Sequence, residues 1–175
     1  AFGGSFLPKD LRALPRVAQR QAVPAPLLNA ITASNERQIQ NAWRWVQEQG
    51  KKKIGVLGFA FKAGTDDLRE SPVVSLVETL LGKGYDLKLY DASVSLAKLI
   101  GANRRYLEQH IPHISRLMVN SIGELVEHAE LIVLGNEHEE FFPILPQLKP
   151  EQIVVDLTAY RKPVSTPARY ERLCG

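Results

Sequence analysis

The chain has 175 residues, of which 45% are hydrophobic and 23% are charged, a composition typical of one soluble globular domain with or without an additional arm. Its 22 basic and 19 acidic residues leave a formal charge of only +3, which is too small for a nucleic-acid-binding surface and excludes nucleic acid as an expected partner. The single cysteine, Cys174, excludes an internal disulfide framework and a multi-cysteine zinc site, and it fits a reducing, cytoplasmic setting.

Hydropathy and the first residues bear on targeting. No apolar run approaches the roughly 18 residues of a membrane-spanning helix, and the first five residues lack the features of a signal peptide. We therefore expect neither export nor a membrane partner. The only methionine is Met118, so we expect the sequence to be part of a longer protein.

The first fifty residues divide into two zones. Residues 1–26 contain four prolines and two glycines, which predicts a loop, a short helix and a turn with only a few residues in regular helix. In residues 27–50, apolar side chains recur every three or four positions, which predicts one long amphipathic helix spanning about 35 Å. Such a helix packs either on its own domain or against a second subunit or a missing N-terminal part.

Residues 51–175 alternate between strand-like and helix-like patterns. Apolar or alternating runs predict strands at residues 54–57, 85–90, 117–119, 131–134 and 153–155. Helices are expected from Ser71–Pro72 to Gly82 or Gly84, over about 95–109, and from a capping box at Ser121–Glu124. This order predicts an α/β fold, a Rossmann-like parallel sheet with flanking helices, preceded by a long helical arm.

The loop that follows the first strand is the most informative candidate site. It spans residues 58–70, about thirteen residues, where such connections usually take about two to six. Its glycines do not form the dinucleotide fingerprint G-x-G-x-x-G, which disfavours ordinary NAD binding by this domain alone. Lys62 and Arg69 suit a phosphorylated ligand, with Phe59 and Phe61 as apolar or stacking surface. Alternatively, the two cations pair with the acidic residues Asp66, Asp67 and Glu70 and order the loop.

A second candidate site lies in residues 3–10. Gly3 and Gly4 permit a close approach of backbone to a ligand, while Lys9 and Asp10 could act as an oxyanion partner and a general acid or base. The same Lys-Asp pair after a proline could simply begin a helix, where an acidic residue favours the helix dipole.

The remaining polar candidates give weaker signals. Asp91 follows a predicted strand, either as a ribose-binding acid or, more simply, as a turn residue. Residues 136–138, Asn-Glu-His, form either a binding loop or a solvated one. His110 and His113 lack convincing metal partners, so no metal site is expected. Cys174 lies too near the terminus for a nucleophile.

Two motifs carry a family resemblance. Residues 2–10 (FGGSFLPKD) and 58–72 (GFAFKAGTDDLRESP) closely resemble two signatures of the nucleotide-sugar 6-dehydrogenases, in the same order and at a similar separation. Residues 101–113 and 134–136 look more like the GDP-mannose branch, which serves alginate synthesis, than the UDP-glucose branch. The likeness covers essentially the whole chain.

The resemblance implies a division of labour within a longer enzyme. It implies an N-terminal NAD-binding Rossmann domain, a long helix at residues 27–50 used in homodimerisation, and a nucleotide-sugar-binding domain at residues 51–175. Residues 1–26 would hold the end of a catalytic loop and a short helix. Family enzymes oxidise the sugar C6 alcohol to a carboxylate by two hydride transfers to NAD, with a cysteine thiolate holding the intermediate. The present chain would not be catalytic alone.

The resemblance also implies roles for single residues. Gly3, Gly4, Lys9, Phe61 and Lys62 would bind the nucleotide sugar, which is GDP-mannose or a related compound. In addition, Asp10 resembles the acid/base aspartate, and Arg69 resembles a contact to NAD bound mainly by the N-terminal domain. Phe6 stands in the catalytic position where the family has its cysteine, and phenylalanine carries no nucleophile. The rival interpretations are a non-catalytic assembly module and a UDP-glucose 6-dehydrogenase.

Overall fold

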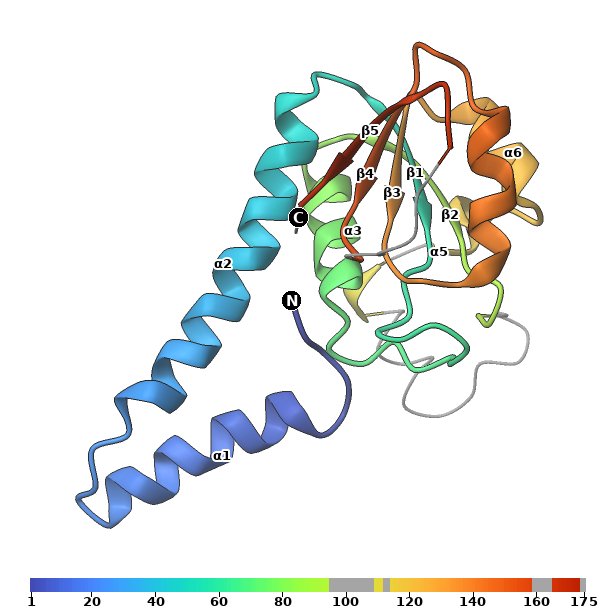
Figure 1. Ribbon diagram of the computed structural model, residues 1–175. Coiled ribbons are helices and arrows are strands. Elements are labelled where there is room, and N and C mark those ends of the chain that lie inside the picture. The colour runs from blue at the N-terminus through green and yellow to red at the C-terminus, as the bar shows by residue number, and fades with distance from the viewer. Residues whose placement is uncertain (95–108, 112–113, 159–164, 174–175) are drawn as a thin grey trace.

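The computed structural model describes residues 1–94, 109–111, 114–158 and 165–173. Its centre is a five-stranded parallel sheet in the order β2-β1-β3-β4-β5 (Figure 1). The strands are β1 (Lys53–Leu57), β2 (Asp86–Tyr90), β3 (Leu131–Leu134), β4 (Ile153–Asp156) and β5 (Arg169–Arg172). This sheet confirms the predicted α/β, Rossmann-like class.

Helices cover both faces of the sheet. One face packs against α3 (Pro72–Gly82) and the C-terminal part of α2 (Pro26–Glu48), and the other packs against α6 (Ile122–His128) and a 3₁₀ helix, η1 (Glu139–Gln147). The central strands β1, β3 and β4 are therefore almost entirely buried. Burial on both faces explains why these strands read in the sequence as continuous apolar runs.

The two N-terminal helices form an arm. Figure 1 shows α1 (Leu7–Arg20) and α2 joined as a hairpin that projects away from the sheet. Only the C-terminal part of α2 joins the core, through buried Ala42 and Val46, and the indole of Trp45 donates to Glu171 of β5 at 2.6 Å. The predicted long helix at residues 27–50 is thus confirmed, and so is the arm.

The first helix is longer than the sequence pattern predicted. The expectation that only a few of residues 1–26 are regular helix was wrong, because α1 has 14 residues and includes Pro15. Pro8 lies in the first turn, where a missing N–H costs nothing. Pro15 removes one internal hydrogen bond, and the leucine, arginine, alanine and glutamine residues around it favour a helix strongly enough to continue past it.

Other local expectations had mixed outcomes. The capping box is confirmed, since the Ser121 hydroxyl accepts a hydrogen bond from the Glu124 N–H at 3.2 Å. Ser71 precedes α3 as predicted but does not cap it, because its hydroxyl donates to the Phe59 carbonyl at 2.7 Å. The helix expected at about 95–109 lies almost wholly outside the described residues.

Two strand assignments were incorrect. The predicted strand at residues 117–119 is replaced by a short helix, α5 (Ile114–Leu117), followed by a single bridge between Met118 and Leu89. Three apolar residues are too few for periodicity to separate strand from helix. The edge strand β5 was missed, since its sequence Arg-Tyr-Glu-Arg lacks an apolar run and an edge strand needs burial on fewer sides. In the described part of the chain, no helix is both long and apolar enough to cross a bilayer.

Candidate functional site

The loop that follows β1 is fixed at its base by Asp91, the residue after β2. One carboxylate oxygen of Asp91 accepts hydrogen bonds from the N–H groups of Phe59 at 2.9 Å and Ala60 at 3.0 Å. The other oxygen accepts from the Ser93 N–H at 3.0 Å. Asp91 is only 5% exposed, so its turn role agrees with the sequence interpretation, whereas a ribose contact does not fit this geometry.

The crevice where the strand order reverses, between β1 and β3, is filled by side chains. Asn136 follows β3, is buried, and donates to the Asp91 carboxylate at 3.3 Å. It lies directly against Gly58, where any side chain would collide with it. His138 caps η1 by accepting from the Glu140 N–H at 3.4 Å. Ligands of such sheets usually bind near this crevice; Asn136 supports the base of the loop there, whereas His138 caps η1.

The two aromatic residues of the loop have different roles. Phe59 is fully buried in the core, so its predicted role as stacking surface was wrong. Phe61 is 37% exposed and its N–H donates to the Asp67 carbonyl at 3.1 Å, which closes the loop. Its ring packs on Gly4, where a Cβ would lie 2.9 Å from the ring. Phe61 therefore joins the loop to the N-terminal segment.

The two loop cations also differ. The Arg69 guanidinium pairs with Asp67 through Nε at 2.8 Å and Nη2 at 2.9 Å, and these hydrogen bonds lower the pKa of Asp67. Lys62 is exposed, and its ammonium has no ion pair with any residue the structure describes. Glu70 pairs instead with Arg12 of α1 at 2.8 Å. Internal pairing thus accounts for Arg69 and leaves Lys62 open to an external anion.

The N-terminal segment lies directly on this loop. The Gly4 N–H donates to the Arg69 carbonyl at 3.2 Å, and Gly3 approaches the Glu70 carbonyl closely. On its other side, the Asn35 amide of α2 holds the Phe2 backbone, accepting from its N–H at 2.7 Å and donating to its carbonyl at 3.1 Å. The structure therefore brings together the two motifs that the sequence treats separately.

The predicted catalytic residues lie at the start of α1. Phe6 is 74% exposed, and the Lys9 ammonium lies 5.5 Å from the centre of its ring. The same ammonium is 3.9 Å from the Asp10 carboxylate, and both side chains are largely exposed. This pair can bind or exchange a proton with a ligand laid over it.

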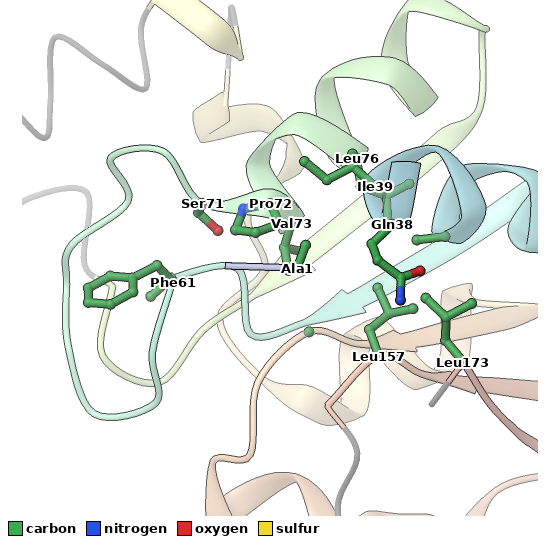
Figure 2. A pocket seen from close by; sticks show the side chains of 13 residues that line it. Ala1, Gln38, Ile39, Phe61, Ser71, Pro72, Val73, Leu76, Leu157 and Leu173 are labelled. Carbon is green, nitrogen blue, oxygen red and sulfur yellow. The ribbon is translucent and has the colours of Figure 1, made fainter. Parts of the chain in front are cut away.

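A largely apolar cavity of about 70 Å³ lies at the carboxyl edge of the sheet, where the 58–70 loop also lies (Figure 2). It lies between α2, α3 and the residues that follow β4 and β5, including Ile39, Leu76, Leu157 and Leu173. Sites that enclose ligands of drug size measure about 300–1,000 Å³, so this cavity cannot enclose a nucleotide. A nucleotide bound at this edge would therefore extend beyond the cavity, over the open rim that the 58–70 loop and the N-terminal segment form. In the described part of the chain, no three His, Cys, Asp or Glu side chains cluster as metal ligands.

The sequence matches a known family over most of its sheet domain. Residues 55–163 match the UDP-glucose/GDP-mannose dehydrogenase family, UDP binding domain. The chain belongs to this family. The match confirms the predicted resemblance and covers the 58–70 loop, although part of the matched range lies outside the described residues.

Relatives of the family extend the similarity to the N-terminal segment. The chain is 48% identical over 175 residues to GDP-mannose 6-dehydrogenase of Pseudomonas putida, covering 99% of this chain and 40% of the relative. It is 35% identical over 145 residues to UDP-glucose 6-dehydrogenase of Pseudomonas aeruginosa, covering 80% of this chain and 31% of the relative. The chain thus spans about 40% of the length of the GDP-mannose relatives it matches.

A solved structure shows the same similarity to GDP-mannose dehydrogenase. The crystal structure of a ternary complex of GDP-mannose dehydrogenase from Pseudomonas aeruginosa superposes with a TM-score of 0.87 at 43% identity, covering 98% of this chain and 39% of that one. This likeness includes the arm as well as the sheet, since nearly all of the chain is covered.

Ser5 and Asn35 are site residues that sequence reasoning missed, whereas Asp67 was named only among the possible partners of the loop cations and does pair with Arg69. The partners of Ser5 and Asn35 are 33 to 64 positions away in sequence, beyond the reach of local periodicity. The motif FGGSFLPKD contained the signal for Ser5, and a polar residue on the inner side of α2 was the available signal for Asn35.

Proposed function

We propose that this chain is the nucleotide-sugar-binding part of an NAD-dependent GDP-mannose 6-dehydrogenase that acts in the cytoplasm. The observation that carries the proposal is Lys62, an exposed cation without an internal partner in the described structure, on the long loop of the family's UDP binding domain. The higher identity to GDP-mannose enzymes than to UDP-glucose enzymes supports the choice of sugar nucleotide.

The proposed binding mode follows from the exposed groups at the rim of the sheet, where the 58–70 loop meets the N-terminal segment. Lys62 meets the diphosphate, because an ammonium with no competing carboxylate gives a charge-assisted hydrogen bond to a phosphate oxygen. The exposed part of Phe61 offers an apolar contact beside it, and the backbone of Gly3 and Gly4 allows the sugar to approach closely. Lys9 contacts the sugar end of the same ligand.

NAD fits this site only at its edge. Held mainly by an N-terminal domain, NAD would supply the hydride acceptor for oxidation at the sugar C6. The Arg69 residue retains its Nη1 group for such a ligand, since its hydrogen bonds to described residues use Nε and Nη2. The Nη1 group alone, beside the ion pair of Arg69 with Asp67, offers only a secondary contact to NAD. This agrees with a cofactor that is held mainly by another domain.

Asp10 is the proposed general acid or base, and Lys9 is its neighbour. The Asp10 carboxylate lies 3.9 Å from the Lys9 ammonium and can accept the proton of the C6 hydroxyl as hydride leaves the C6 carbon. Phe6 offers no nucleophile at the position of the family cysteine. Ser5 does not replace it, since its hydroxyl is held between Asp67 and Arg69. Residue 6 therefore cannot form the covalent intermediate of the family route.

Steady-state kinetics of the full-length protein test this proposal. We expect Phe6→Cys to show NAD reduction that depends on GDP-mannose and is faster than with UDP-glucose. A preference for UDP-glucose would assign the protein to the UDP-glucose 6-dehydrogenases instead. Absence of NAD reduction with either sugar, in a variant that still folds, would refute the enzyme assignment.

Phe6 favours a second candidate, a non-catalytic assembly module. The arm exposes large apolar side chains that a monomer would leave in water, among them Leu14, Val17 and Leu27, the last at 73% exposure. Under either function we propose that this arm is a homodimer interface. Sedimentation of Leu27→Ser should then show a weakened dimer. An intact dimer together with an inactive Phe6→Cys variant would favour the assembly module.

A further inference from the structure

Asp67 receives an unusual set of hydrogen bonds for a loop residue. Its Oδ1 atom accepts from the Arg69 backbone N–H at 3.1 Å and from Nε at 2.8 Å. Its Oδ2 atom accepts from Arg69 Nη2 at 2.9 Å and from the Ser5 hydroxyl at 3.2 Å. The side chain is only 17% exposed. Such a two-oxygen grip fixes both the position and the plane of the guanidinium.

The same carboxylate connects the loop to the N-terminal segment. Arg69 Nη2 also donates to the Ser5 hydroxyl at 3.2 Å, so Ser5, Asp67 and Arg69 form a closed triangle. Beside it, the Gly4 N–H donates to the Arg69 carbonyl. The backbone and a side chain of the N-terminal segment are therefore attached at one point.

Asp67 also holds the loop segment that carries the free cation. Its backbone carbonyl accepts from the Phe61 N–H at 3.1 Å, directly before Lys62. One residue thus contacts each of the three segments with proposed ligand-binding roles, namely residues 3–10, Phe61–Lys62 and Arg69.

We propose that Asp67 is a positioning residue, which aims the Arg69 guanidinium and holds the Gly3–Asp10 segment against the loop for ligand binding. This inference rests on the proposed function. Fixing binding groups before the ligand arrives removes the ordering cost that a loop of this length would otherwise impose on binding.

A contribution to folding stability does not by itself explain the ion pair between Asp67 and Arg69. The Arg69 side chain is 42% exposed, and ion pairs at such positions contribute little to folding. The base of the loop is held separately by Asp91. Loss of the Asp67 carboxylate should therefore leave the fold intact and alter the geometry of the rim.

The test compares Asp67→Asn with Asp66→Asn in the full-length protein. Both changes remove one negative charge from adjacent positions, but Asp66 is exposed and its influence on Arg69 is coulombic. We measure affinity for NAD and for GDP-mannose by calorimetry, hydrogen exchange of peptides that cover residues 2–6, and the thermal midpoint. Asp67→Glu tests rescue by a carboxylate, and Ser5→Ala tests the triangle from its other corner.

We expect Asp67→Asn to weaken NAD binding about tenfold and to accelerate exchange at Gly4, with little change in thermal midpoint. Asp66→Asn should have a much smaller effect than Asp67→Asn, Asp67→Glu should recover part of the affinity, and Ser5→Ala should accelerate exchange in the same direction. Unchanged affinity and exchange in Asp67→Asn, or equal effects of Asp66→Asn, would overturn the inference. Faster exchange with unchanged affinity would also overturn it, because that result describes a purely structural contact.

Failure of the proposed function gives a different result. Wild type would then bind neither NAD nor GDP-mannose, whichever residue stands at position 67. The exchange measurement still decides whether Asp67 holds the N-terminal segment, since Gly4 donates to the Arg69 carbonyl without any ligand.

Discussion

Replacing Asp91 by alanine should destabilise the fold at the sheet's carboxyl edge. The Asp91 carboxylate is the acceptor for the Phe59 and Ala60 N–H groups, which belong to residues that are almost fully buried. Alanine removes this acceptor and offers no replacement, and water has little access to the site. Two buried donors are then left unsatisfied.

The expected cost follows from the number of donors. Each buried unsatisfied backbone group costs about 1–3 kcal/mol, so two groups predict about 2–6 kcal/mol. The Asn136 amide also loses its partner, which favours the upper part of this range. For a chain of this size each kcal/mol lowers the thermal midpoint by roughly 2–4 °C, so we expect a decrease large enough for routine calorimetry.

Differential scanning calorimetry of three variants provides the assay. Asp91→Asn keeps one oxygen that can still accept from Phe59 and Ala60, so it should lose less than half as much as Asp91→Ala. Glu151→Ala, which changes an exposed residue just before β4, serves as the control and should change stability by no more than about 0.5 kcal/mol. If Asp91→Ala unfolded at the same temperature as this control, the loop base would not depend on the carboxylate and the reasoning would be refuted.

Three further predictions concern packing and titration. Gly55→Ala should cost about 1–3 kcal/mol in urea unfolding because its Cβ would collide with the Leu125 side chain; paired with Leu125→Ala, most of this overpacking penalty should disappear, and an additive result would contradict the contact. Burial, followed by the hydrogen bond to Glu140, raises the pKa of Tyr90 to about 12, so phenolate absorbance should appear late in an alkaline titration, and earlier in Glu140→Gln. Arg69 lowers the pKa of Asp67, so the stability that this pair contributes is present above about pH 4 and is lost as pH falls through the native pKa. The small stability difference that we expect between wild type and Asp67→Asn should therefore shrink further in acid, and a difference that grew would reverse the sign of this argument.

The sequence predicted the sheet because its central strands are buried on both faces. Runs such as Ile54–Leu57 and Leu131–Leu134 predict buried strands rather than helices, since they are short, apolar and separated by helical patterns. The edge strand β5 has a polar sequence, and its pairing with β4 depends on a neighbour that local pattern does not reveal. The extent of α1 was underestimated because proline was given more weight than the residues around it.

The candidate site was predictable only as two separate motifs. Family resemblance pointed to Lys62 and to the Gly3–Asp10 segment, but the loop meets this segment through Asp67 and Ser5, and Asn35 holds Phe2 beside them. Phe59 shows the opposite error, because an aromatic residue in a loop looked available for a ligand and is fully buried. Burial and long-range hydrogen bonds are properties of the folded chain, and one sequence does not contain them in any local pattern.

The most direct test of the central claim is the affinity of the full-length protein for GDP-mannose when Lys62 is replaced by alanine. Loss of a charged hydrogen bond costs about 1.5–3 kcal/mol, so calorimetry should show binding weaker by roughly 10- to 100-fold. Lys149→Ala, which removes an exposed lysine from the loop before β4, should bind as wild type does. Equal affinities for wild type, Lys62→Ala and Lys149→Ala would contradict a nucleotide-sugar site at this rim.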